Sequence, residues 1–198
     1  MPKVALTICF PAAAEAKPLL LAHHYLSAKS RGFRSGFNVG LKDGDKLIGC
    51  AIFTNFPVPE VAVGLYGLAR DDQFGLYELS RFCISPDYQA TEHNLGTWFL
   101  ARAINQLKYL NPVRALLSYA DTELHVGTLY QAYGFKYYGL TALKKDWKPV
   151  DSALPLSRGC TDAGEWVPRT QKHRYLITYD KKLKPLWNEQ PYPKKVTI

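Results

Sequence analysis

Apolar residues along the chain fall into short runs, which turns rich in Gly, Pro, Asn and Asp separate. Runs that contain many β-branched and aromatic residues, or that alternate apolar with polar positions, predict strands. These runs cover residues 4–9, 37–42, 46–53, 77–84, 113–120, 136–143 and 173–180. Asp43-Gly44-Asp45, between the second and third runs, is a compact hairpin signal.

Helical periodicity is found in three further segments. Residues 12–27 are rich in Ala and Leu, with Pro18 early in the segment. A second helix is predicted to begin after Asn94, its expected N-cap, and to end at Asn111-Pro112. Its apolar positions recur at helical spacing, at Leu95, Trp98, Phe99, Ala103 and Leu107. The third helix is short, carries Tyr130 and ends at Gly134.

The remaining segments are predicted to be irregular. We expect loops at residues 54–74, 85–93 and 144–169, and an extended tail over the last eighteen residues, which contain three prolines. The order of the elements predicts an α/β (α+β) fold: a mixed central sheet of about six to seven strands, flanked by helices. We expect one domain over residues 1–180 and a basic, Pro-containing C-terminal tail over residues 181–198.

Composition narrows the class of protein. The 198 residues are 47% hydrophobic and 21% charged, which is typical of a globular protein. No apolar run is long enough to span a membrane, and Met1–Phe10 predicts a first strand rather than a leader. The four cysteines are scattered without CxxC spacing, at Cys9, Cys50, Cys83 and Cys160. We therefore expect a reduced, cytoplasmic protein with no metal site.

The net charge of +8 is concentrated in the C-terminal third. Residues 1–135 hold 12 Lys or Arg against 11 Asp or Glu, whereas residues 136–198 hold 13 against 6. Aromatic residues are interleaved with this basic segment, a combination that suits a nucleic acid; a solubilising surface is the alternative. The predicted nucleic-acid contacts are Lys144, Lys145, Arg169, Lys172, Arg174, Lys181 and Lys182.

The densest group of chemically active residues follows the predicted strand at 113–120. Asp121 ends this strand, a polar turn with His125 and Gly127 follows, and Tyr130 lies on the next short helix. A carboxylate, an imidazole and a phenol thus lie near the carboxyl edge of a strand, where α/β folds place their active sites. Asp121 is the candidate proton acceptor and Tyr130 the candidate acid; a turn-capping Asp and a packing aromatic are the alternatives.

A second group lies in the predicted central strand. Arg81 is a cation in an otherwise apolar run, and a buried guanidinium must be paired or bind a ligand. It could pair with Glu78 or grip a carboxylate or phosphate of a donor. Ser80 is a weaker candidate for substrate binding.

The order of elements resembles the GNAT acyltransferase architecture, in which the central strand and the next strand splay apart around an acyl donor. The ending Tyr130-Gln-Ala-Tyr-Gly-Phe135 also resembles that superfamily. The domain over residues 1–180 is therefore expected to be a GNAT-like catalytic domain.

Several motifs together resemble the Mom family of phage DNA-modification proteins. They are His24-Tyr25, Glu78-Leu-Ser-Arg81, Ser118-Tyr-Ala-Asp121, His125-x-Gly127-x-x-Tyr130, Lys172-His-Arg-Tyr and Pro191-Tyr-Pro-Lys194. The resemblance implies an enzyme that converts adenine in DNA to its N6-carbamoylmethyl form and so protects phage DNA from host restriction. It also implies that Asp121, Tyr130, Arg81, His24 and Tyr25 are catalytic, and that Glu78, Ser80, His125 and Gly127 bind substrate or donor.

The donor is open at this point. GNAT enzymes that use CoA carry a Gly-rich phosphate loop, but the corresponding stretch here, Asp87–Gly96, has one glycine and two acids. An activated acyl donor is required, and acetyl-CoA and glycyl-tRNA are both candidates. The expected partners are double-stranded DNA with its adenine flipped out, a tRNA as a further candidate, and a second copy in a homodimer; no membrane is expected.

Two other functions remain open. One is a conventional acetyl-CoA-dependent N-acetyltransferase that acts on an amine of a small molecule or protein. The other is a non-catalytic DNA-binding module. Clustering of Glu78, Arg81, Asp121 and Tyr130 in one cleft would favour an enzyme.

Overall fold

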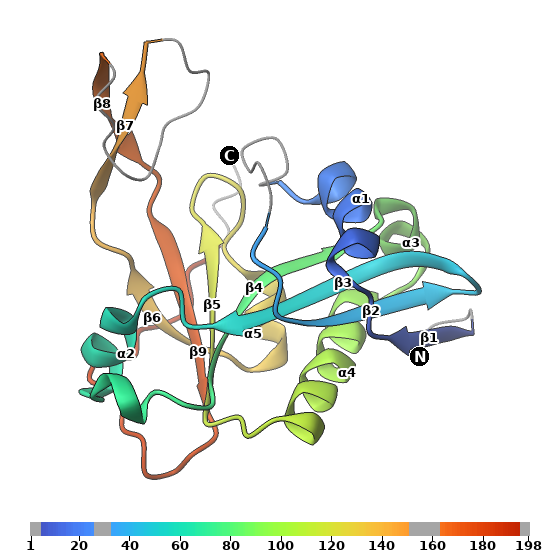
Figure 1. The fold of residues 1–198 in the computed structure, drawn as a ribbon, viewed down its shortest axis with the longest axis horizontal. Helices are drawn as coiled ribbons and strands as arrows, with labels where there is room; N and C mark the ends of the chain where they lie inside the picture. The colour runs from blue at the N-terminus through green and yellow to red at the C-terminus, as the bar shows by residue number, and fades with distance from the viewer. Residues whose placement is uncertain (1–4, 26–32, 151–162, 195–198) are drawn as a thin grey trace.

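The computed structural model describes residues 5–25, 33–150 and 163–194. It contains a seven-stranded sheet in the order β1-β2-β3-β4-β5-β9-β6, and a separate two-stranded sheet of β7 and β8 (Figure 1). The strands are β1 Leu6–Cys9, β2 Phe37–Asp43, β3 Lys46–Asn55, β4 Leu76–Ile84, β5 Ala115–Asp121, β6 Lys136–Leu140, β7 Lys144–Pro149, β8 Gly164–Arg169 and β9 Lys172–Thr178. The helices are α1 Ala13–His23, α2 Pro59–Tyr66, α3 Pro86–Thr91, α4 Leu95–Leu110 and α5 Thr128–Tyr133, with a 3₁₀ turn at Arg70–Asp72.

One pair of strands decides where the sheet opens. β4 and β5 run parallel, while all other neighbours in the main sheet run antiparallel. The parallel ladder begins at Leu76↔Ala115 and ends at Leu79↔Ser118. Beyond that point β4 continues beside β3, and β5 continues beside β9. The two strands therefore diverge at their carboxyl ends and leave a gap in the middle of the sheet.

Helices bury both faces of the main sheet. α4 packs on β2 and β3 through Leu95, Phe99, Ala103 and Leu107, the helical spacing expected from the sequence. On the other face α1 covers β3 and β4. Its residues Ala16 and Leu20 contact a smaller buried cluster that includes Cys50 and Cys83. A mixed α/β fold is thus confirmed, with seven strands in the main sheet.

Three segments predicted as loops contain regular structure. Residues 54–74 include α2, whose Pro59 occupies the first turn and whose Gly67 ends the helix with a φ of 69°. Residues 85–93 include α3, which also begins with a proline. Residues 144–169 include β7 and β8, which pair from Lys144↔Arg169 to Pro149↔Gly164. Here non-local pairing outweighs the local Pro and Gly content.

Smaller differences concern the ends of elements. Asn94 precedes α4 as predicted, but its φ is 58° and its side chain makes no capping hydrogen bond. The strand predicted to end at residue 143 ends at Leu140. The strand predicted to end at residue 180 ends at Thr178, because the next two backbone N–H groups donate to Arg114 O. Residue 4, residues 26–27 and Cys160 lie outside the described residues.

Residues 181–194 lie along the main sheet. Leu183 is buried in the cluster formed with α2, the N–H of Gln190 donates to Tyr137 O, and the Tyr192 hydroxyl donates to Phe135 O over 2.8 Å. Within the part of the chain that the structure describes, no helix has the length and apolar character needed to cross a membrane.

Candidate active site

A cavity of about 160 Å³ lies where β4 and β5 diverge. It collects side chains from the end of α1, from both diverging strands, from the turn and helix after β5, and from the start of β9. Its lining residues are His24, Tyr25, Glu78, Leu79, Ser80, Arg81, Phe82, Tyr119, His125, Leu129, Tyr130 and Lys172. Seven of the nine residues predicted to be catalytic or to bind substrate therefore share one cavity; Asp121 and Gly127 are not in its lining.

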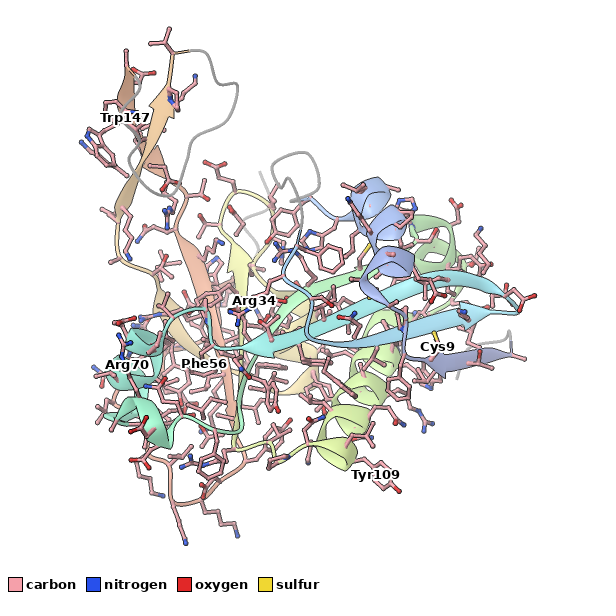
Figure 2. All side chains as sticks on the ribbon, in the orientation of Figure 1. Cys9, Arg34, Phe56, Arg70, Tyr109 and Trp147 are labelled. Atoms are coloured by element: carbon pink, nitrogen blue, oxygen red, sulfur yellow. The ribbon has the colours of Figure 1, made fainter. Side chains whose placement is uncertain are left out.

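Glu78 is the carboxylate of this cavity. It lies on β4 opposite Thr54 of β3 and Leu117 of β5, just before the strands diverge. Burial raises the pKa of Glu78 from its usual 4.5 to about 7, against the opposing attraction of Lys172, Arg81 and Arg34. Figure 2 shows Arg34 over the centre of the main sheet. A carboxyl group with a pKa near neutrality is suited to accept and release a proton at physiological pH.

Tyr130 is the buried phenol of the cavity. It is held on α5, a helix of six residues that begins after Gly127 and ends at Gly134, both with positive φ. Burial raises the pKa of Tyr130 to about 12, and a hydrogen bond with Ser118 opposes that rise. The phenol therefore keeps its proton at neutral pH and can donate it.

The β4 backbone bulges at Ser80. Ile52 of β3 is opposite Arg81 and Phe53 is opposite Leu79, so Ser80 has no partner residue on β3. The Ser80 hydroxyl donates to Ile52 O over 3.1 Å. The Arg81 guanidinium donates to Ser80 O over 2.6 Å. The bulge thus changes the direction in which the side chains of Ser80 and Arg81 leave the strand.

Arg81 remains a cation inside the cavity. Burial lowers the pKa of Arg81, whereas the electrostatic influence of Tyr25 and Glu78 raises it. An arginine side chain stays protonated in proteins even when its pKa falls. The cavity therefore contains a fixed positive charge beside a carboxyl group that titrates near neutrality.

Three aromatic rings gather at the α1 side of the cavity. The rings of His24 and Tyr25 stack with centroids 4.7 Å apart, and Tyr25 meets His125 edge-on at 6.1 Å. Burial lowers the pKa of His24 to about 4 and also lowers that of His125. Both imidazoles are therefore largely neutral at pH 7. Nδ1 of His125 accepts a hydrogen bond from the Gly127 N–H over 3.2 Å.

Asp121 lies at the end of β5 with its carboxylate already occupied. One oxygen accepts a hydrogen bond from the Thr170 hydroxyl over 2.8 Å, and the other accepts one from the Glu123 N–H over 3.1 Å. Its backbone carbonyl accepts from the N–H groups of Leu124 and His125. These contacts are those of a turn-capping aspartate.

Gly127 shapes the turn rather than the cavity. Its φ is 72°, and a Cβ at this position would lie 2.5 Å from the ring of Tyr175. Glycine is therefore required by both backbone conformation and space.

The predicted nucleic-acid residues occupy four places. Lys172 lines the cavity, while Lys144 and Lys145 are exposed on β7. Arg169 forms an ion pair with Asp146, and Arg174 lies over the Trp187 ring at 4.2 Å. Lys172 begins β9, whereas Lys181 and Lys182 come after its other end. The two ends of this strand are about 20 Å apart. The structure thus does not bring the seven residues together.

Tyr119 is a cavity residue that the sequence analysis missed. It follows Ser118 directly, past the last pair of the β4–β5 ladder. Burial raises its pKa, so its phenol is protonated. The Ser118–Asp121 motif contains Tyr119 and could have indicated a role in the site, but a tyrosine within a strand is more often a packing residue.

Comparison with known proteins settles the family. The sequence profile of the Mom protein family matches residues 5–194, nearly the whole chain. The chain belongs to the Mom protein family. No curated protein matches the chain in a search by sequence.

The chain shares its fold with GNAT acetyltransferases. A GNAT family acetyltransferase from Listeria monocytogenes 4b F2365 superposes with a TM-score of 0.54 at 14% identity, covering 90% of this chain and 98% of that chain. An IAA acetyltransferase from Bacillus cereus ATCC 14579 gives 0.52 at 14%, covering 88% and 99%. A GNAT family acetyltransferase from Elizabethkingia anophelis with acetyl-CoA bound gives 0.51 at 17%, covering 87% and 97%. The GNAT-like fold expected from the sequence is confirmed.

Among the described residues, the groove at the start of α4 does not fit the pyrophosphate of CoA. The groove there is lined by Phe82, Gln89, Glu92, Asn94, Leu95, Gly96 and Leu129. This lining, drawn from the described residues, includes no Lys or Arg and does include a carboxylate that is only 6% exposed, Glu92. A bound pyrophosphate needs cations or donors that replace its solvation, and none of these lining side chains is a cation. The residues present therefore do not fit CoA.

The described part of the chain also contains no group of three His, Cys, Asp or Glu side chains that could hold a metal ion.

Proposed function

We propose that this Mom-family chain is a transferase that converts adenine N6 in DNA to its N6-carbamoylmethyl form, and that the modification protects phage DNA from restriction. Family membership and the GNAT-like fold support a group transferase. The observation that carries the proposal is the cavity between β4 and β5, which combines a proton-accepting carboxyl, a fixed cation and a buried phenol.

The adenine N6 amine needs a base, because its lone pair is delocalised into the ring. We assign this role to Glu78, whose pKa of about 7 lets it take the N6 proton as the new bond forms. Asp121, the acceptor predicted from the sequence, is a weaker candidate because Thr170 and Glu123 already donate to its carboxylate. Its contribution is to hold the turn that carries His125.

Two residues act on the donor. Tyr130 donates its phenolic proton to the leaving oxygen as the donor bond breaks, which its high pKa permits. Arg81, with its guanidinium fixed to Ser80 O, stabilises the negative charge that develops on the carbonyl oxygen of the donor.

The aromatic side of the cavity suits a base taken out of the duplex. Flipped bases are bound by stacking and by hydrogen bonds to their edges. Tyr25 and His24 offer stacked rings, and Tyr119 offers a protonated phenol from the opposite strand. Both imidazoles there are neutral, so they do not repel a protonated or polarised purine.

A glycyl donor accounts for all atoms of the added group. N6 attacks the glycyl carbonyl, the N6–C bond forms, the ester C–O bond to the tRNA ribose breaks, and the N6 proton passes to Glu78. The free glycyl amine then attacks C6 through a five-membered ring, the original C6–N6 bond breaks, and the proton that the amine loses passes to the departing N6. The product is the carbamoylmethyl isomer, and no oxidant or reductant is needed. A glycyl ester also needs no CoA site, and the groove at the start of α4 does not provide one.

Nitrogen labelling tests this route. Cells that express the protein are fed ¹⁵N-glycine, and the modified nucleoside is fragmented by mass spectrometry. The label is expected on the nitrogen joined to C6, while the carboxamide nitrogen comes from adenine. A modified nucleoside without glycine label, or with the label on the carboxamide, would contradict the route and leave the transferase open to another donor.

The modification itself is tested directly. The protein is expressed in a bacterium, plasmid DNA is digested to nucleosides, and a deoxyadenosine heavier by the carbamoylmethyl group is sought. We expect this species with the native chain, its loss in Glu78→Gln and Tyr130→Phe, and its retention in Glu123→Gln, an exposed carboxylate outside the cavity. Unmodified DNA from soluble, folded native protein would refute the proposed function in that host.

A further inference from the structure

β7 and β8 form a ribbon that stands clear of the main sheet (Figure 1). An isolated two-stranded ribbon is only marginally stable in water. Here the two strands are held by six paired positions and by the edge-on contact of Trp147 with Trp166, whose ring centroids lie 5.3 Å apart. Trp166 is nevertheless 55% exposed. The exposed ring of Trp166 is therefore available for contact with a partner.

The two faces of the ribbon differ in character. Opposite residues share a face, and successive residues alternate between faces. One face carries charges, from Lys144, Asp146 and Lys148 on β7 and Glu165 and Arg169 on β8. The other carries Lys145 and the Trp147–Trp166 pair, and Figure 2 shows Trp147 on the side turned away from the main sheet.

The charge of the ribbon fits a polyanion. Its strands contain Lys144, Lys145, Lys148 and Arg169 against Asp146 and Glu165. Arg169 and Asp146 neutralise each other in an ion pair, so lysines supply the excess charge. Within the described residues, Lys144 and Lys145 are exposed and form no ion pair. They are therefore available for contacts to phosphates.

The root of the ribbon is fixed to the rim of the cavity. Thr170, directly after β8, donates to the Asp121 carboxylate over 2.8 Å. Gln171 donates to Thr141 O over 2.6 Å and accepts the hydroxyl and N–H of Thr122. The next residue, Lys172, lines the cavity. A molecule held by the ribbon is therefore positioned relative to Glu78 and Tyr130.

We infer that the β7–β8 ribbon lies in a groove of double-stranded DNA and holds the duplex beside the adenine that enters the cavity. The inference rests on the proposed function and names the surface through which the substrate is gripped. The major groove of B-DNA admits a two-stranded β-ribbon. Lys144 and Lys145 contact phosphates, and the charged face contributes polar contacts within the groove.

The salt dependence of binding tests the ribbon. Full-length native protein, Lys144→Gln/Lys145→Gln, and the matched pair Lys181→Gln/Lys182→Gln are titrated with a fluorescent 20-base-pair duplex between 50 and 300 mM salt. All four lysines are exposed, and both pairs remove two charges. Circular dichroism confirms that each variant is folded. The plasmid nucleoside assay is run in parallel.

The ribbon pair is expected to weaken duplex binding about tenfold or more, and to reduce the slope of log K against log salt by about 2, since each phosphate contact contributes about 0.9. The Lys181/Lys182 pair is expected to change both by much less. Trp166→Ala should also weaken duplex binding, because the ribbon loses the Trp147 contact that holds its two strands together. It should leave the slope unchanged, because it removes no charge.

Each other outcome counts against a specific statement. Equal losses from both lysine pairs would show that only net charge matters and would overturn the ribbon assignment. Native protein that binds and modifies DNA, with ribbon variants that bind equally well, would overturn the ribbon inference alone. Tighter binding of folded tRNA than of duplex DNA, lost in the ribbon pair, would assign the ribbon to the donor and overturn the inference. Native protein that neither binds nor modifies DNA would refute the proposed function itself.

Discussion

The raised pKa of Glu78 makes a quantitative prediction about stability. The folded protein holds a proton on Glu78 up to about pH 7, whereas the unfolded chain releases it near pH 4.5. Between these values the folded state binds more protons than the unfolded state, so the free energy of unfolding falls as pH rises. At about 1.4 kcal/mol per pKa unit, the difference corresponds to about 3 kcal/mol.

Glu78→Gln should remove this pH-dependent cost. Gln has the same shape but no charge, so the variant should match the native protein at pH 4.5 and be about 3 kcal/mol more stable at pH 8. For a chain of this size that corresponds to a rise in Tm of roughly 6–12 °C. Catalytic activity should be lost in the same variant, because the proton acceptor is gone.

Urea unfolding at several pH values between 4.5 and 8 measures this effect. Glu123→Gln serves as the control, because this side chain is exposed and its replacement should change stability little. An advantage of Glu78→Gln that stays constant from pH 4.5 to pH 8 would show that Glu78 titrates normally. The assignment of Glu78 as the base would then lose its physical support.

Three further variants separate catalytic from structural roles. Tyr130→Phe should lower modification by about 10²-fold or more while costing only about 1 kcal/mol of stability, as measured by nucleoside analysis and urea unfolding. Asp121→Ala should cost about 1–3 kcal/mol, because it leaves the Thr170 hydroxyl and the Glu123 N–H without their acceptor; full stability with lost modification would instead restore Asp121 as the base. Gly127→Ala should destabilise by more than about 1 kcal/mol, and a neutral result would contradict the crowding against Tyr175.

The sequence was sufficient where local signals agreed with the tertiary structure. The apolar spacing of α4 predicted the face that packs on the sheet, and the turn residues between β2 and β3 predicted their hairpin. Glu78, Arg81 and Tyr130 share one cavity because the central strand and the next strand splay apart. The resemblance to the GNAT architecture implied this arrangement.

Other features depend on contacts that a local pattern does not contain. β7 and β8 are polar and flanked by Pro and Gly, so their sequences alone do not predict strands. Their pairing depends on contacts between the two segments, such as that of Trp147 with Trp166. Asp121 has the position of a proton acceptor in the sequence, yet the hydroxyl of Thr170, 49 residues later, donates to its carboxylate. The pKa of Glu78 depends on burial, which only the packed structure defines.

The early end of the β4–β5 ladder has a consequence for how this family can evolve. Past Leu79 and Ser118, the two strands face the cavity with edges that have no neighbouring strand. Peptide groups on such edges can hold a ligand by main-chain hydrogen bonds, in the way that a sheet edge accepts an added strand. A hold of that kind does not depend on which side chains the strands carry. The side chains that line the pocket can therefore change one by one while a main-chain hold of this kind is kept.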